Sequence, residues 1–294
     1  MFFPHTNINS PSILAFLVLL GLTACKQPIA TSIQYPAANG SQDSYQVNSE
    51  WQLVWADEFN QVQLNTDSWN RQVEEAGRFN QEWQRYTDSN DNAYIENGYL
   101  VLKAIHESDT LGHNQYSSAR LNTAEKHSWK YGKIAARIQL PYGQGLWPAF
   151  WMLGSNISEN GGDTPWPQSG EIDILELYGS KNDALVEANI HYADHANNHA
   201  MLTAPHFVLE QGIFADAFHI FEIEWNKKEI RWMVDGNEYA STTIESAERA
   251  EFHQPFFILL NIAVGGQWAG RPDKSTPFPQ YMYVDWVRVY QNAG

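Results

Sequence analysis

The sequence predicts an all-β fold made of two packed antiparallel sheets. Apolar and acidic residues alternate from Phe221 to Trp225, and apolar residues occupy every second position from Ile134 to Leu140. A period of two is typical of strands with one buried face. Long helical periods are missing, apart from a short one around Ser246 to Glu251. Many strands separated by frequent turn residues therefore indicate two stacked sheets.

The C-terminal half supplies further strands and one hairpin. Segments Ile230–Val234 and Glu238–Thr242 flank Asp235-Gly236-Asn237, which is a hairpin signal. Two more stretches, Phe256–Val264 and Tyr283–Tyr290, are apolar and rich in β-forming residues. We therefore expect each of these segments to be a strand of the sandwich.

Composition limits the possible partners. The chain of 294 residues is 43% hydrophobic, which is enough for a sizeable core, and carries a formal charge of −16. Nucleic acid is excluded as an expected partner because phosphate binding needs clustered Lys and Arg. The acidity is also explained by solubility alone. The 12 Trp, 14 Tyr and 14 Phe suit sugar binding and β-cores equally, so their number does not decide between them.

The N-terminus reads as an export signal. Residues Ile13 to Leu22 form an apolar run that is too short to span a bilayer and fits the core of a signal peptide. Leu22-Thr23-Ala24-Cys25 follows and resembles the lipobox of bacterial lipoproteins, in which the cysteine is lipidated. Residues 1–12 lack the Lys or Arg usual in such signals. Cys25 is the only cysteine, so the alternative is a free thiol rather than an intrachain disulfide.

These features divide the chain into three parts. We expect a lipoprotein signal peptide at 1–24, a flexible tether at 25–50 rich in Gln, Ser, Asn, Pro, Ala and Gly, and one folded domain at 51–294. The expected location is the outer membrane or cell surface of a bacterium, with the protein held by its lipid anchor as a monomer. No second linker or internal repeat interrupts the domain.

Three acids cluster within six residues, at Glu171, Asp173 and Glu176. On a strand, Glu171 and Asp173 share a face, whereas Glu176 falls on the opposite one. One extra residue, a β-bulge at Ile174-Leu175, would bring all three acids to one face. Retaining glycosidases need two carboxyl groups about 5–5.5 Å apart. The alternative is a solvated edge strand, which the apolar residues around the acids make less natural.

The segment 171–176, EIDILE, resembles the bulged signature of glycoside hydrolase family 16, in its laminarinase branch of endo-β-1,3-glucanases. The likeness extends over residues 51–291 and includes four more motifs: NQEWQRYT at 80–87, LWPAFWMLG at 146–154, AVGGQW at 263–268 and VDWVRVY at 284–290. The family implies a jelly-roll β-sandwich of two curved sheets with a concave substrate cleft. Arg85, where the branch has an aromatic residue, and Ala193, where it commonly has glycine, are departures.

The resemblance assigns roles to single residues. It implies that Glu171 is the nucleophile, Glu176 the general acid/base and Asp173 the assisting acid between them. Seven further positions match substrate-binding residues, with the first four on the non-reducing side of the cut and the others close to the catalytic strand: Asn80, Arg120, Trp147, Trp151, Trp166, His191 and Trp268. The alternative for the tryptophans is core packing, and for His191 a satisfied strand histidine. Because proline is uncommon in central strands, we expect a bend or an edge position near Pro148.

No cofactor is implied for the chemistry, and a structural calcium is the one ion the resemblance suggests. Its matching positions are Glu58, the Gly98 carbonyl and Asp285, a set of oxygen ligands that suits Ca²⁺. No cluster of His and Cys indicates zinc.

Three functions remain open at this stage. The first is endo-hydrolysis of β-1,3-glucan, and the second is the same chemistry on mixed-linkage glucan or on a galactan such as agarose. The third is a carbohydrate-binding sandwich without catalysis. Lectin-like relatives usually lose one or both glutamates, and this chain keeps Glu171 and Glu176. The expected partner in each case is a polysaccharide.

Overall fold

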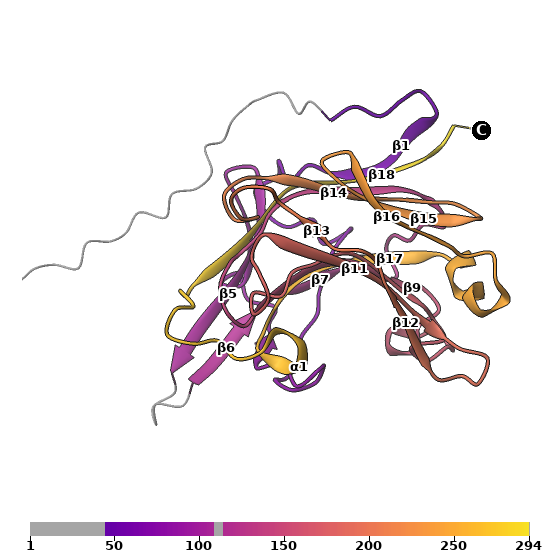
Figure 1. Ribbon diagram of the computed structural model, residues 1–294. Coiled ribbons are helices and arrows are strands. Elements are labelled where there is room, and N and C mark those ends of the chain that lie inside the picture. The colour runs from indigo at the N-terminus through magenta and orange to yellow at the C-terminus, as the bar shows by residue number, and fades with distance from the viewer. Residues whose placement is uncertain (1–44, 109–113, 294) are drawn as a thin grey trace, which may run out of the picture. The chain divides into compact units, whose positions relative to one another are not determined.

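The computed structural model describes residues 45–108 and 114–293, which form two β-sheets packed face to face (Figure 1). The first is ten-stranded in the described residues, with the order β16 (Asn237–Thr243), β15 (Glu229–Val234), β14 (His219–Trp225), β8 (Gly132–Gln139), β18 (Gln280–Asn292), β5 (Tyr99–Ser108), β6 (Asn114–Ser118) and β3 (Gln84–Tyr86). Two strands lie off this path, β1 (Trp51–Asp57) beside β18 and β4 (Ala93–Glu96) beside β5.

The second sheet has eight strands in the same described part. Its order is β12 (His199–Thr203), β11 (Leu185–Ala193), β10 (Glu171–Glu176), β9 (Leu146–Gly154), β17 (Phe256–Val264), β7 (Arg120–Asn122) and β2 (Asn70–Arg71), with β13 (Phe207–Val208) beside β11. Helical turns are short: η1 (Ser158–Asn160), η2 (Ala247–His253) and α1 (Gly266–Ala269). The short helical period predicted around Ser246 to Glu251 is thus the 3-10 segment η2.

The predicted sandwich is confirmed, with one correction to the pairing. Among the described strands every pair is antiparallel except β3 with β6, which run parallel, so the ten-stranded sheet is mixed. The hairpin is confirmed at Asp235-Gly236, where both residues have positive φ, 51° and 74°, as the right-handed twist of a two-residue turn requires. Asn237 already pairs with Val234 and belongs to the strand.

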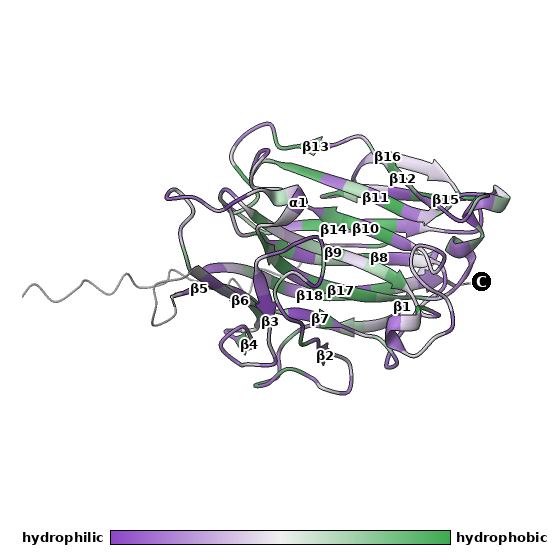
Figure 2. Ribbon diagram, turned by 90° about the horizontal axis from the view of Figure 1, so that it is seen from below, coloured by the Kyte–Doolittle hydropathy of each residue, from purple (hydrophilic) through white to green (hydrophobic). Residues whose placement is uncertain are grey.

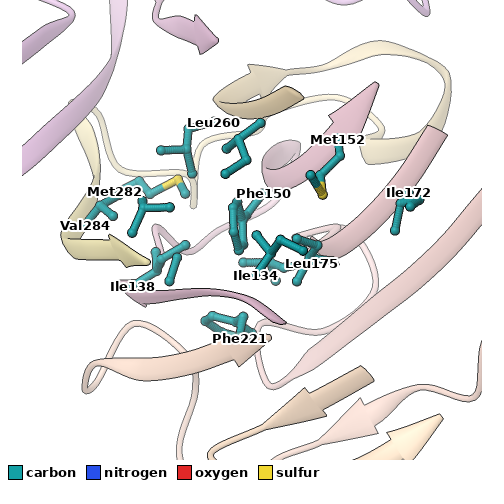
Figure 3. Packing of buried hydrophobic residues seen from close by; sticks show 14 of the residues in the cluster. Ile134, Ile138, Phe150, Met152, Ile172, Leu175, Phe221, Leu260, Met282 and Val284 are labelled. Carbon is teal, nitrogen blue, oxygen red and sulfur yellow. The ribbon is translucent and has the colours of Figure 1, made fainter. Parts of the chain in front are cut away.

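Alternating side chains of the two sheets fill the space between them (Figure 3). Phe150 on β9 and Leu260 on β17 come from one sheet, and Ile134 on β8 and Phe221 on β14 come from the other, all fully buried. Strand β17 is buried along its whole length, and Figure 2 shows apolar stretches along β10 and β17. Truncating a core aromatic such as Phe150 to alanine costs about 3–5 kcal/mol.

The segment before β1 packs on the outer face of the ten-stranded sheet. The Tyr45 hydroxyl donates a hydrogen bond to Glu222 on β14, and its ring lies 5.2 Å from that of Trp286 on β18. Lys133 reaches the same Glu222 carboxylate at 3.2 Å. The predicted tether at 25–50 therefore has its last residues, from Tyr45, seated on the domain. The signal peptide and Cys25 lie outside the described residues, within which no helix is long and apolar enough to cross a membrane.

Candidate active site

Strand β10 carries the three acids, and the predicted bulge is confirmed. Opposite β9, Asp173 pairs with Trp151 but Leu175 pairs with Phe150, so one extra residue is inserted between them. Ile174 and Leu175 are consecutive and both lie in the core. Two successive inward side chains return Glu176 to the face that carries Glu171 and Asp173. All three acids line the same cavity on the outer face of the eight-stranded sheet.

The bulge is held from behind by the other sheet. The indole Nε1 of Trp232, on β15, donates to the backbone carbonyl of Asp173 at 2.9 Å. Trp232 is fully buried, so this bond crosses the core. A buried carbonyl needs a partner, and the ring supplies one where the strand pairing is irregular.

Glu176 is buried and held by side-chain hydrogen bonds, to Tyr178 among others. Trp147 Nε1 donates to its Oε1 at 2.8 Å, and Asn189 Nδ2 donates to its Oε2 at 2.6 Å. Burial, followed by the nearby carboxyls of Asp173 and Glu171, raises the pKa of Glu176 to about 8. The carboxyl is therefore protonated at neutral pH and can act as a general acid.

Asp173 is 2% exposed and lies between the two glutamates in the sequence. Burial, followed by the charge of Glu171 and a hydrogen bond to it, raises the pKa of Asp173 well above its usual range. Asp173 is thus the protonated donor of its bond to Glu171. Glu171 also accepts a hydrogen bond from Trp166 Nε1 at 2.8 Å. Glu171 is thus held by two hydrogen-bond donors and faces the cavity, where its oxygen can attack a sugar.

His191, on β11, approaches the acids from the side. Its Nε2 lies 3.2 Å from Asp173 Oδ2 and 3.9 Å from Glu171 Oε1. Its Nδ1 lies 2.8 Å from Nε2 of His199, on β12. The ligand atoms of His191, Asp173 and Glu171 fall within 4.8 Å of one another, so this is the described group that could hold a metal ion.

Next to the acids, Trp151 and Arg120 shape the cavity wall. The Arg120 guanidinium carbon stands 4.7 Å from the centre of the Trp151 ring, and its Nε donates to Gln72 at 2.8 Å. Trp151 Nε1 donates to Asn261 Oδ1 at 2.7 Å. The ring is thereby fixed in orientation while it stays partly open to solvent.

Most of the predicted binding residues meet at this cavity, with differences in detail. Asn80 lines it and donates to Glu82 at 3.2 Å. Trp147 lines it too but is only 8% exposed, and its indole is committed to Glu176. Three predicted residues are not among those that line it: Trp166, His191 and Trp268. Trp166 and His191 still approach the acids, whereas Trp268 stands on α1 and is 56% exposed.

Four residues that sequence reasoning did not single out belong here. Glu82 and Asn261 line the cavity, Asn189 bonds Glu176, and His199 bonds His191. Asn261 had a readable signal, because it is the one polar residue in the apolar run Phe256–Val264. The other three gave no readable signal in the sequence, because only the fold places Glu82 at the cavity and brings Asn189 and His199 to their partners on neighbouring strands.

The proposed calcium ligands are engaged elsewhere. Both oxygens of Glu58 accept hydrogen bonds from Arg288, at 2.7 and 2.8 Å, and Asp285 accepts one from Arg137 at 2.7 Å. Gly98 turns the chain at a φ of 80°. Each carboxylate already faces a guanidinium, so this set does not fit a calcium ion as the side chains stand. The catalytic acids contact none of these residues.

Two glutamates share one face of one strand; burial keeps Glu176 protonated, and Glu171 is held by two hydrogen-bond donors. This arrangement defines a glycoside hydrolase site. The family model for glycosyl hydrolases family 16 matches residues 78–288, and the chain belongs to that family. It is 39% identical to the beta-glucanase of Rhodothermus marinus, over 82% of this chain and 85% of the relative. It is 35% identical to glucan endo-1,3-beta-glucosidase A1 of Niallia circulans, over 81% of this chain and 38% of the relative.

A solved structure agrees. The laminarinase catalytic domain of Thermotoga maritima superposes with a TM-score of 0.72 at 40% identity, covering 83% of this chain and all of that domain. This likeness confirms the jelly-roll fold expected from the sequence. The chain spans only 35% and 38% of the length of two of its curated relatives.

Proposed function

We propose that the protein hydrolyses internal β-1,3-glucosidic bonds of laminarin-type glucans with retention of configuration. The observation that carries this proposal is the pair of unlike carboxyls on β10. Glu171 attacks the anomeric carbon while Glu176 gives its proton to the departing oxygen, which yields a glycosyl-enzyme. Glu176, now a carboxylate, then takes a proton from water, and that water displaces Glu171. Asp173 holds the Glu171 carboxylate by its hydrogen bond. The chemistry needs no cofactor.

Substrate choice is argued from the cavity wall and from the relatives. Trp151 offers a partly open ring beside Arg120, and Asn80 and Glu82 supply polar groups for sugar hydroxyls. The Niallia circulans and Thermotoga maritima proteins are named for β-1,3-glucan and laminarin. Mixed-linkage glucan or an agar-type galactan would engage the same acids through other wall contacts. Product chromatography on laminarin, lichenan and agarose separates these substrates.

The acids are tested by amide substitution. Glu171→Gln and Glu176→Gln keep the shape of each side chain and remove its acid–base chemistry. We expect each variant to lower turnover on laminarin by several orders of magnitude with the fold intact. The glutamate that remains in each variant cannot take over the role of the one that is replaced. The Glu176 variant should regain turnover with a good leaving group when azide replaces water. Near-normal laminarin turnover in either variant would refute the assignment.

We also propose an exported lipoprotein anchored at Cys25, acting as a monomer. The apolar run before Cys25 supports the anchor. Tyr45 leads the chain onto the outer face of the ten-stranded sheet, whereas the acids open on the outer face of the other sheet.

A further inference from the structure

A second histidine supports the one beside the acids. His199 stands on β12, the edge strand next to β11, and its Nε2 lies 2.8 Å from Nδ1 of His191. The two rings are nearly parallel, at 11°, with centres 5.1 Å apart. Trp166 packs against His199 with ring centres 4.6 Å apart. His199 is not among the residues that line the cavity, and its hydrogen bond reaches the acids through His191.

The protons around Asp173 dictate how the pair must be protonated. The proton of Asp173 serves its bond to Glu171. The other oxygen, Oδ2, is buried, and no described residue hydrogen-bonds to it in the resting geometry. His191 Nε2 is the atom poised to do so, at 3.2 Å. Catalytic hydrogen bonds are often poorly aligned before substrate binds and tighten afterwards. This contact requires the proton of His191 to sit on Nε2.

A neutral imidazole has one N–H, so a proton on Nε2 leaves Nδ1 of His191 as an acceptor. The hydrogen bond made by one ring nitrogen decides which tautomer is present. With its own proton on Nε2, His199 would be the donor that selects this form of His191. Burial and the neighbouring His191 lower the pKa of His199, against the charge of Glu171. At neutral pH His199 is therefore uncharged and keeps a single N–H to donate.

We propose that His199 is a positioning residue that holds His191 in the tautomer whose Nε2–H faces Asp173. The inference rests on the proposed function of the three acids. In the opposite tautomer a bare nitrogen would face Asp173 Oδ2 and would draw the Asp173 proton away from Glu171. The titratable groups that face the pair are Glu171 and Asp173 on β10, and the Trp166 indole covers its open side.

The test compares two substitutions of His199 with a matched control. His199→Leu removes the donor, whereas His199→Gln keeps an N–H group that can reach Nδ1. His195→Leu is the control. His195 lies in the loop between β11 and β12, is highly exposed, and pairs with Glu248 away from the acids. We expect His199→Leu to lower kcat roughly tenfold with KM little changed, because loss of a partner that orients a functional histidine typically has an effect of this size. His199→Gln should recover most of that loss.

A spectroscopic readout separates positioning from simple folding. In ¹⁵N NMR of the whole protein we expect His191 to carry its proton on Nε2, and to lose that preference in His199→Leu but not in His199→Gln or His195→Leu. A wild-type spectrum with the proton on Nδ1 would overturn the inference, as would a His199→Leu protein with unchanged tautomer and kcat. The NMR result does not depend on turnover. Failure of the proposed function would show separately, as laminarin turnover in Glu171→Gln.

Discussion

Replacing Trp147 by phenylalanine removes one hydrogen bond from the general acid and keeps most of the buried ring. The bond runs from Trp147 Nε1 to Glu176 Oε1 at 2.8 Å. A donor stabilises the carboxylate, so this bond lowers the pKa of Glu176 against the larger upward effect of burial. Its loss should therefore raise that pKa further.

The size of this increase in the pKa of Glu176 follows from the energy of the lost hydrogen bond. A hydrogen bond to a charged group contributes about 1.5–3 kcal/mol, and 1.36 kcal/mol corresponds to one pH unit. The change is therefore roughly one to two pH units. Asn189 still donates to the other oxygen of Glu176 at 2.6 Å and takes up part of the charge. We therefore expect the pKa of Glu176 to rise by about one pH unit, near the lower end of this range.

The assay is kcat/KM against pH on a laminarin oligosaccharide, which reports groups of the free enzyme. Glu176 works as an acid in the first step, so activity falls as pH rises through its pKa, about 8 in the wild type. The alkaline limb should move upward in Trp147→Phe. Trp166→Phe is the control, because its indole bonds Glu171 and its loss should leave that limb in place. An alkaline limb that stays put or moves down in a folded Trp147→Phe protein would show that the indole does not tune the acid.

Three further predictions concern the stability contribution of Glu176, the partly open ring of Trp151 and the lipid anchor at Cys25. The pKa of Glu176 is about 8 in the folded protein against 4.5 for the free group, so its stability contribution is present at low pH and is lost as pH rises through 8. Glu176→Gln should then melt higher than the wild type at pH 9 and no higher at pH 4, by thermal unfolding. Trp151→Ala should reduce kcat/KM on β-1,3-glucan oligosaccharides while the melting temperature changes little, since the ring is partly open; the reverse pattern would make it a core residue. Cys25→Ala should abolish lipid attachment and membrane partitioning of the native protein, and an unmodified Cys25 in its mass spectrum would contradict the anchor.

The strands were predictable because their buried faces leave a period-two pattern. Phe256–Val264 was expected as a strand and is β17 with those bounds. Near Pro148 a bend or an edge position was expected, and the edge position was wrong, since β9 lies between β10 and β17. Proline is tolerated there because β10 ends opposite it: Leu177, just past that strand, donates to the Pro148 carbonyl at 3.2 Å. No local signal in the sequence places the end of one strand against a proline in another.

The parallel pairing of β3 with β6 could not be predicted from the sequence for a related reason. Gln84–Tyr86 is three residues long and has no period of its own to read. Its place is fixed by distant contacts, such as the Gln84 side chain accepting a hydrogen bond from the Val264 amide at 2.7 Å. The acids could be read from their spacing. Asn189, which donates to Glu176, and His199, which hydrogen-bonds to His191, could not, because strand register brings these residues together.

The bulge in β10 links the fold to the chemistry more directly than any single side chain. With a regular strand, Glu176 would point into the core beside Phe150, and Leu175 would face the cavity. The extra residue reverses both, because one inserted position changes the face of everything after it. Burial on the outer face still raises the pKa of Glu176, but there the carboxyl has Trp147 and Asn189 as donors and an opening to substrate. The Trp232 bond to the Asp173 carbonyl fixes this register from inside the core. Family resemblance in the six-residue signature is therefore a resemblance in strand geometry as much as in acids, since the same acids without the bulge would not share a face.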